Sequence, residues 1–245
     1  MQTRNFRFSC FLILVFSLFA GGYGRAQEAK KLDVKKITGV VSPDAAAVPA
    51  LLDEQHVAFH PLDVVNWAAY PYRPEVSFRI AHTGRELLLH YKVKEASVRA
   101  LAAADNGRVW EDACVEFFVS PQGNDCYYNF ECNCAAKLLI QAGVWNERRP
   151  LAEPEVLAEV KRWSSLGTEP FAERAGECSW EVTLVIPVGA FFQHALTCLD
   201  GRTMKGNFYK CGDKLQTPHF LSWSPIGLQR PMFHCPAFFG TLFFE

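Results

Sequence analysis

Two stretches in which apolar and polar residues alternate constrain the fold of this chain most strongly. They cover residues 109–121 and 127–133. The apolar residues at their alternate positions are Val115, Phe117, Val119, Tyr128, Phe130 and Cys132. Because successive side chains of a strand point to opposite faces, this pattern predicts a β-hairpin with one apolar face and one polar face.

The polar face of this predicted hairpin carries Asn129, Glu131 and Asn133, and Trp110 comes just before its first strand. Amides and carboxylates beside a Trp suit a sugar, because the indole covers the apolar face of the sugar ring and planar polar groups bind its hydroxyls. The same alternation is also typical of a sheet with one solvated face and no ligand. The pattern alone therefore leaves both interpretations open.

The first 26 residues have the organisation of a secretory signal peptide. Arg4 and Arg7 form a charged start, residues 8–20 are apolar but too short for an ordinary membrane span, and Gly24-Arg25-Ala26 offers small residues for cleavage. We expect an exported protein (periplasmic, cell-surface or secreted) whose mature chain begins near Gln27. No later segment of the sequence is long and apolar enough to span a bilayer.

Charge and cysteine content limit the classes of partner. Removing the three arginines of residues 1–26 lowers the formal net charge from −1 to −4, which gives no reason to expect nucleic acid or an anionic membrane as a partner. Eight cysteines follow residue 26, and disulfides are allowed after export, but their pairing cannot be read from sequence. No CxxC pair occurs. We expect Cys114 and Cys178 to be small buried apolar residues.

Several further segments alternate in the manner of strands and are bounded by turn residues. The predicted strands cover residues 76–81, 86–94, 137–141, 180–186, 205–211, 219–223 and 238–244. Short helical turns are expected in residues 98–104, 153–161 and 188–194. Many short strands with little helix predict a single all-β domain, an antiparallel β-sandwich over residues 60–245, preceded by a leader and edge segment in residues 27–59.

Six short motifs follow one another along the chain, and their order and joint presence are informative. The stretches are Asn66–Pro74, Trp110–Phe118, Tyr127–Glu131, Asn207–Asp213, Leu221–Pro225 and Phe238–Gly240. Together they resemble a family 9 carbohydrate-binding module, specifically the family-9-like group of exported bacterial proteins. The resemblance extends over about residues 60–245 and implies a β-sandwich with a shallow sugar-binding slot.

The resemblance also implies which residues bind the sugar. In the better-understood members, two Trp rings sandwich a terminal sugar, and Trp110 and Trp223 are the matching residues here. Glu116, six residues after Trp110, matches an acidic sugar-binding position. Asn129, on the polar strand face, is expected to bind hydroxyls beside Glu116.

The remaining tryptophans have other expected roles. Trp180 shares a strand face with three aliphatic residues, which predicts a core position. Trp67, in a Pro-rich run, is expected to pack beneath a loop. Trp145 and Trp163 lie in loop regions, where each can extend the binding site or cover the core.

The expected function is non-catalytic binding of a polysaccharide or oligosaccharide, with glycan-degrading enzymes as partners. A glycoside hydrolase is one alternative, because Glu116 and Glu131 supply two carboxylates, although nothing in the sequence marks a catalytic acid. The wider family can also hold structural calcium, for which Glu111 and Asp112 are candidate oxygen donors. Both acids are also compatible with a solvated loop.

A haem-binding redox module is the second alternative, because DOMON-like domains with the same type of sandwich bind haem between axial side chains. Met232, His219, His234 and Lys210 are the candidate axial ligands. Their spacing in the sequence does not show which two of them would be the axial ligands. A Soret absorption band in the purified protein would distinguish this class from a carbohydrate binder.

Overall fold

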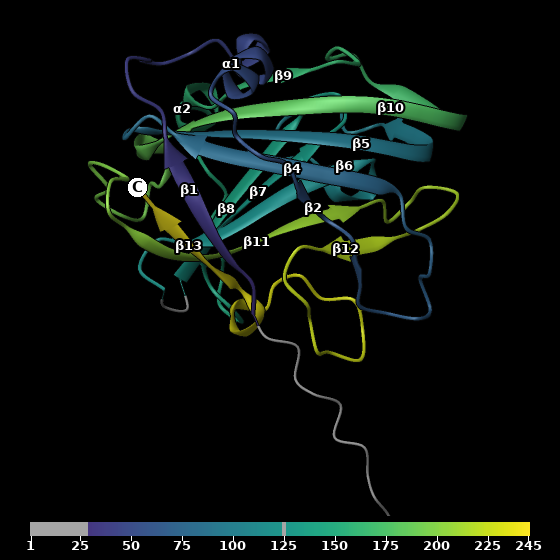
Figure 1. The fold of residues 1–245 in the computed structure, drawn as a ribbon. Coiled ribbons are helices and arrows are strands. Elements are labelled where there is room, and N and C mark those ends of the chain that lie inside the picture. Colours follow the sequence, from purple (N-terminus) through teal and green to yellow (C-terminus); the bar gives the residue numbers. More distant parts are fainter. Residues whose placement is uncertain (1–28, 124–125) are drawn as a thin grey trace, which may run out of the picture.

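In the computed structural model, which describes residues 29–123 and 126–245, the chain is mostly β-strand. The predicted all-β sandwich is confirmed. The predicted signal peptide, residues 1–26, lies outside the described residues. The strand pairings follow one continuous order, β8-β7-β6-β11-β13-β1-β4-β5-β10-β9, which curls so that its two halves face each other (Figure 1).

The first half of this order contains the hairpin that the sequence alternation predicts. Its strands are β6 (Cys114–Ser120), β7 (Cys126–Asn133), β8 (Leu138–Val144), β11 (Thr203–Cys211) and β13 (Gly240–Phe244). All of them pair antiparallel, with β6 between β7 and β11. The short strand β12 (Phe220–Ser222) pairs with the last three residues of β11, and β3 (Val64–Val65) pairs with β12.

The second half is formed by long strands that cover the first. They are β4 (Glu75–His82), β5 (Glu86–Ala100), β10 (Phe171–Pro187) and β9 (Lys161–Ser164), with β2 (His60–Pro61) paired to β4. The helical turn expected in residues 98–104 is wrong at its start, because β5 continues to Ala100. Pairing with β10, including Val98 opposite Arg174, holds this stretch in a strand.

A single strand, β1 (Lys31–Lys36), connects the two halves. Its first part pairs parallel with β13, where Leu32 lies opposite Leu242, and its last two residues pair parallel with β4. The sequence predicted an edge segment here, before a domain that began at residue 60. The structure instead places β1 between two strands and makes it part of the sandwich.

Helices are short and lie at the ends of strands. They are α1 (Val48–Glu54), α2 (Pro154–Glu159), and the 3-10 turns η1 (Ala45–Ala47), η2 (Val109–Glu111), η3 (Val188–Ala190) and η4 (Pro236–Phe238). Pro at the first turn suits α1 and α2, because the proline needs no hydrogen-bond acceptor there. Within the described residues, no helix is long and apolar enough to cross a membrane.

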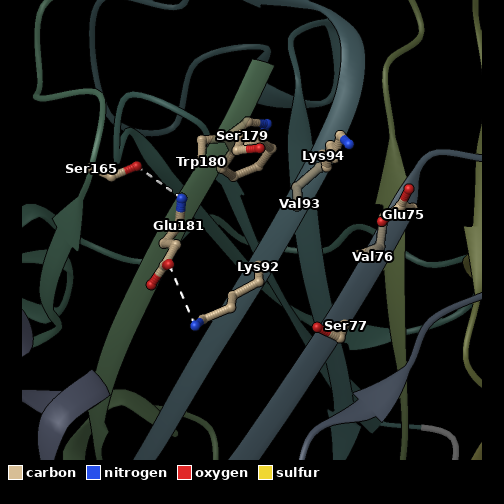
Figure 2. Close-up of a pocket in the computed structure, with 10 residues that line it drawn as sticks. All are labelled: Glu75, Val76, Ser77, Lys92, Val93, Lys94, Ser165, Ser179, Trp180 and Glu181. Carbon is tan, nitrogen blue, oxygen red and sulfur yellow. Dashed lines mark hydrogen bonds and ion pairs between the residues drawn. The ribbon is translucent and has the colours of Figure 1, made fainter. Parts of the chain in front are cut away.

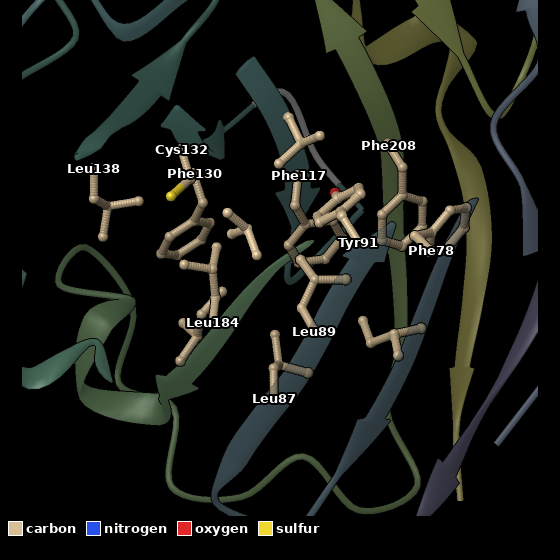
Figure 3. Close-up of a cluster of buried hydrophobic side chains, with 14 of the residues drawn as sticks. Phe78, Leu87, Leu89, Tyr91, Phe117, Phe130, Cys132, Leu138, Leu184 and Phe208 are labelled. Carbon is tan, nitrogen blue, oxygen red and sulfur yellow. The ribbon is translucent and has the colours of Figure 1, made fainter. Parts of the chain in front are cut away.

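The core lies between the two halves and is rich in aromatic rings (Figure 3). Phe208 of β11 stacks on Phe78 of β4, with ring centres 3.7 Å apart, and on Phe117 of β6, with centres 4.8 Å apart. Trp180 is only 1% exposed, so its predicted core position is confirmed. This packing fixes which face of β6, β7 and β11 points inward, and therefore which residues are available on the other face.

Candidate functional site

A pocket of about 660 Å³ opens on the face of the β8-β7-β6-β11 sheet that points away from the core. Its floor is built by strand residues, and its walls come from η2, β12, Tyr70 and the loop of residues 230–234. The lining residues are far apart in sequence. The pocket therefore forms only when the strands have paired in their final register.

Strand alternation produces the polar floor. Glu116 of β6 lies directly opposite Glu131 of β7, and Cys211 of β11 lines the pocket beside them. Their sequence neighbours Phe117 and Phe130 face the core instead. The division of the hairpin into an apolar and a polar face is thus confirmed.

Aromatic rings form the walls of the pocket. Trp110, in η2, is half-buried and lines the pocket, with the Arg108 guanidinium 5.8 Å from its ring centre. Tyr70 and Phe220 meet edge to face at 4.8 Å, and Phe233 lies nearby in the wall. Such rings can cover an apolar ligand surface.

A second Trp, in the turn after β8, lies beside the pocket residue His234 but does not line the pocket itself. Trp145 is 39% exposed and stacks on the His234 ring, with centres 6.1 Å apart. His234 lines the pocket and shares a hydrogen bond of 2.8 Å with the Tyr127 hydroxyl. Burial lowers the pKa of His234 to about 4, so the imidazole is neutral at physiological pH and can donate or accept.

Three carboxyl groups meet in this pocket. Burial, reinforced by the charge of Glu131, raises the pKa of Glu116 well above its usual value. Burial also raises the pKa of Glu131 to about 7 and that of Asp213 to about 6. Within the described part of the chain, no ion pair links any of the three to a basic side chain. The floor is therefore rich in hydrogen-bonding oxygens that lack internal cationic partners.

Asn129, a predicted hydroxyl ligand, lies fully buried beside the pocket and does not line it. Its amide group donates to Glu131 Oε1 at 2.8 Å, and its oxygen accepts a hydrogen bond from Arg149. The Arg149 guanidinium also lies 3.8 Å from the Tyr127 ring centre. The structure therefore gives Asn129 a positioning role, since it orients the Glu131 carboxylate.

Trp223, the second predicted stacking ring, lies in the core and not beside Trp110. It is 3% exposed and meets Phe208 edge to face at 5.6 Å. The alternation of β12 explains this position, because Leu221 and Trp223 share the inward face while Phe220 faces the pocket. The structure thus brings Trp110 and Glu116 together but leaves Trp223 outside the pocket.

The two candidate calcium donors are already engaged by basic and amide groups. Asp112 is 1% exposed and accepts hydrogen bonds from two backbone N–H groups and from the Asn133 amide, with Arg99 at 3.2 Å. Glu111 pairs with Arg108 at 2.7 Å. These contacts satisfy both carboxylates, so Glu111 and Asp112 do not fit a calcium site.

The candidate haem ligands are divided between two places. Lys210 and His219 lie fully buried and contact each other at 2.8 Å, and Lys210 also pairs with Glu95 at 2.9 Å. Met232 and His234 line the pocket, on one loop and only two residues apart. Neither pair is placed to approach a haem from opposite sides, so the arrangement gives no support to the haem alternative.

A second depression, of about 510 Å³, lies on the β4-β5-β10 sheet (Figure 2). Lys92 and Glu181 face each other across it at 3.6 Å, and the Ser165 hydroxyl accepts a hydrogen bond from the Glu181 backbone N–H. The aromatic residue in its lining, Trp180, is 1% exposed. Lys92 and Lys94 are both paired with glutamates and the Trp180 ring is covered, so this depression offers no exposed aromatic platform for a sugar.

Sequence reasoning missed several residues of the pocket. Cys211 and Asp213 were within a matched motif, and the alternation with Tyr209 could have placed Cys211 on the same face as Glu116. Arg230 and Phe233 belong to a loop without periodicity. No local pattern predicts that this loop returns over the sheet.

A β-sandwich with an aromatic pocket of this polarity has the architecture of a carbohydrate-binding module. The model of carbohydrate-binding family 9 matches residues 46–244, and the chain belongs to this family. No curated protein matches the chain.

Solved structures agree with this assignment. A protein from Bacteroides uniformis ATCC 8492, proposed to bind carbohydrate, is 75% identical, with a TM-score of 0.88 over 89% of this chain and 100% of that chain. A family 9 carbohydrate-binding module from Caldicellulosiruptor kristjanssonii, solved with cellotriose, has a TM-score of 0.50 and 12% identity over 88% of this chain and 94% of that chain. The second likeness concerns the fold alone.

Proposed function

We propose that this protein binds the terminus or a short segment of a polysaccharide or oligosaccharide, without catalysis, in the pocket over β6, β7 and β11. The observation that carries the proposal is the combination of aromatic walls with a carboxylate floor in a chain of carbohydrate-binding family 9. The cavity volume also lies within the range of small-ligand sites.

The proposed contacts follow from the chemistry of a sugar. Trp110 offers a half-buried ring for the apolar face of the pyranose, and Phe220 or Phe233 adds apolar surface beside it. Glu116 and Glu131 accept hydrogen bonds from vicinal hydroxyls. Stacking and a few directed hydrogen bonds then hold the sugar in a pocket whose floor is fixed by paired strands.

The arrangement of the two glutamates favours binding over hydrolysis. A glycosidase places its two carboxyl groups on opposite sides of the scissile bond. Here Glu116 and Glu131 lie side by side on adjacent strands and project from the same floor. A sugar above that floor would meet both acids from one side, so we expect no release of reducing sugar from xylan, cellulose, pectin or mixed glucans.

Export completes the proposal. The charged and apolar pattern of residues 1–26 suits a signal peptide, which would place the protein outside the cytoplasm. The protein would then capture sugar for transport or for glycan-degrading enzymes. Mass spectrometry of the exported protein should find an N-terminus near Gln27, and an intact Met1 would contradict this step.

A glycan array probed with the mature protein, followed by calorimetry on each hit, tests the function. Glu131→Gln should weaken binding about tenfold, because the amide replaces one of the two carboxyl oxygens with an NH2 group that cannot accept a hydrogen bond. Glu177→Gln is the matched control, since that side chain is 72% exposed on β10 and far from the pocket in the fold. Binding that is unchanged in Glu131→Gln, or sugar release that is lost in this variant, would contradict the proposal.

A further inference from the structure

Two cysteines and one glutamate come together at the base of the pocket. Cys114 and Glu116 are two residues apart on β6 and therefore share a face, and Cys211 of β11 lies directly opposite Cys114. One ligand atom from each residue lies within 4.8 Å of the other two. The Cys211 thiol lies 3.0 Å from Glu116 Oε1.

We propose that Cys114, Cys211 and Glu116 form a site for a thiophilic divalent metal ion, with Zn²⁺ as the expected ion. In a tetrahedral zinc site, bond lengths of about 2.3 Å to sulfur and 2.0–2.2 Å to oxygen separate neighbouring ligand atoms by roughly 3.4–3.8 Å. The Cys211 sulfur and Glu116 Oε1 lie 3.0 Å apart, and all three ligand atoms lie within 4.8 Å of one another. Small side-chain rotations are sufficient to enclose an ion.

The ligand types select the class of metal. Thiolates bind zinc and similar soft or borderline ions, whereas calcium and magnesium require oxygen ligands. A calcium site assembled from Glu111 and Asp112 is not supported, because both are satisfied by arginines. The thiol pair is therefore a different site with a different metal preference.

The surroundings favour a cation at this point. Glu116 is 3% exposed, and among the residues that the structure describes its carboxylate receives a hydrogen bond only from the Cys211 thiol, a weak donor. Glu131 and Asp213 add two more carboxyl groups to the same pocket. The nearest buried ammonium, Lys210, projects from the opposite face of β11 and is paired with Glu95 at 2.9 Å.

The site has a path for the ion and a free coordination position. Cys114 is fully buried, but Glu116 and Cys211 line the pocket, so an ion can enter from solvent and keep one position directed into the pocket. Three protein ligands with one open position are typical of exchangeable or reactive zinc sites, whereas structural sites are closed. Because carboxylates have two oxygens, Glu116 can contact the ion with Oε1 and leave Oε2 for another ligand.

Cobalt titration of the mature, reduced protein tests this proposal. Co²⁺ should bind with one equivalent and give sulfur-to-cobalt charge-transfer absorption with the intense visible bands of a tetrahedral site, and Zn²⁺ should displace it. Cys211→Ser should weaken metal binding about 100-fold or more, and Cys114→Ser similarly. Cys178→Ser is the matched control, because Cys178 lies on β10 and is not part of the cluster.

A second measurement needs no variant and covers the case in which a serine variant fails to fold. Zn²⁺ should slow alkylation of Cys211, which lines the pocket, in the native wild-type protein, as measured by peptide mass spectrometry, while the rate at Cys178 stays constant. Absence of the charge-transfer band, equal binding by Cys211→Ser, or a Cys114–Cys211 disulfide in the purified protein would each overturn the proposal.

Discussion

Strand β11 separates two buried polar clusters. In one cluster a carboxylate is paired with an ammonium group, and in the other the carboxyl groups have no such partner. On its core side, Lys210 pairs with Glu95 at 2.9 Å and contacts His219 at 2.8 Å, and the Trp180 indole N–H donates to Glu95 at 2.7 Å. We call these four residues the closed cluster. Its ammonium and carboxylate are fully buried and satisfy each other.

On the other side of β11, the pocket floor gathers carboxyl and thiol groups without such pairing. Glu116, Glu131 and Asp213 have raised pKa values because burial disfavours their charged forms. The floor is open to a ligand through the pocket, whereas the closed cluster is not. The difference indicates that internal pairing serves the fold, while unpaired acceptors at a pocket are available for a ligand.

The largest expected effect is a loss of stability when the ion pair of the closed cluster is broken. Glu95→Gln leaves the buried Lys210 ammonium without its carboxylate, and we expect the free energy of unfolding to fall by about 3–5 kcal/mol. Urea denaturation measures this loss. Glu177→Gln, at an exposed position, should stay within about 0.5 kcal/mol of wild type. A loss below about 1 kcal/mol in Glu95→Gln would show that the pair is not structural.

The pH dependence of stability gives the next largest effect. Burial and the Lys210 charge lower the pKa of His219 from 6.5 to about 3. Between these values the unfolded chain binds a proton that the folded chain does not, so stability falls as pH decreases from 6.5 to 3. The contribution of His219 over this pH range is at most about 4 kcal/mol.

His219→Gln should reduce that loss, although the acidic residues continue to contribute in both proteins. Urea denaturation at several pH values measures the difference between variant and wild type. If the two curves remained parallel from pH 6.5 to 3, His219 would already be charged in the folded state.

A smaller effect, on binding alone, is expected at Trp110. Trp110→Ala removes a ring platform and should lower affinity for a glycan hit by about 1–3 kcal/mol, which is roughly 5-fold to 150-fold, with little change in melting temperature. Trp180→Ala is the structural comparator and should cost about 3–5 kcal/mol of stability. Calorimetry and thermal melts of both variants separate these outcomes. If Trp110→Ala unfolded while the folded fraction kept its affinity, Trp110 would be a packing residue.

The smallest effect on glycan affinity and stability is expected from a substitution in the depression on the β4-β5-β10 sheet. Lys92→Ala should leave glycan affinity unchanged and alter stability by no more than about 0.5 kcal/mol, because the Lys92 side chain is 46% exposed and its ion pair with Glu181 lies at the surface. Calorimetry against the same glycan checks this. A clear loss of affinity would move the binding site to the second sheet.

Local alternation predicts much of the fold and part of the site. Because each strand has a period of two, the sequence assigned Phe117 and Phe130 to the core and Glu116 and Glu131 to the other face, as observed. The same rule, applied to the short β12, would have placed Trp223 with Leu221 in the core. The family resemblance instead suggested that Trp223 was a ligand.

What the sequence could not predict depends on pairing between distant strands. Cys114 and Cys211 are almost a hundred residues apart, and only the register of β6 on β11 makes them neighbours. Asn129 has the side-chain direction expected from alternation, yet the hydrogen bonds to Glu131 and Arg149 occupy its amide. Contacts between distant strands produce no pattern in the sequence of either strand, so they cannot be predicted from local alternation.

The position of β1 has a consequence for how the molecule acquires its fold. Lys31 pairs with Thr241, more than 200 residues later in the chain, while the end of β1 pairs with β4. Loop closure over this distance is entropically costly and correlates with slow folding. Until β13 is in place, β1 can hold only its two-residue pairing with β4, and the two halves of the sandwich keep unpaired edges. Association between partly folded chains is therefore favoured during this interval, when the exposed strand edges are open to pairing with another copy.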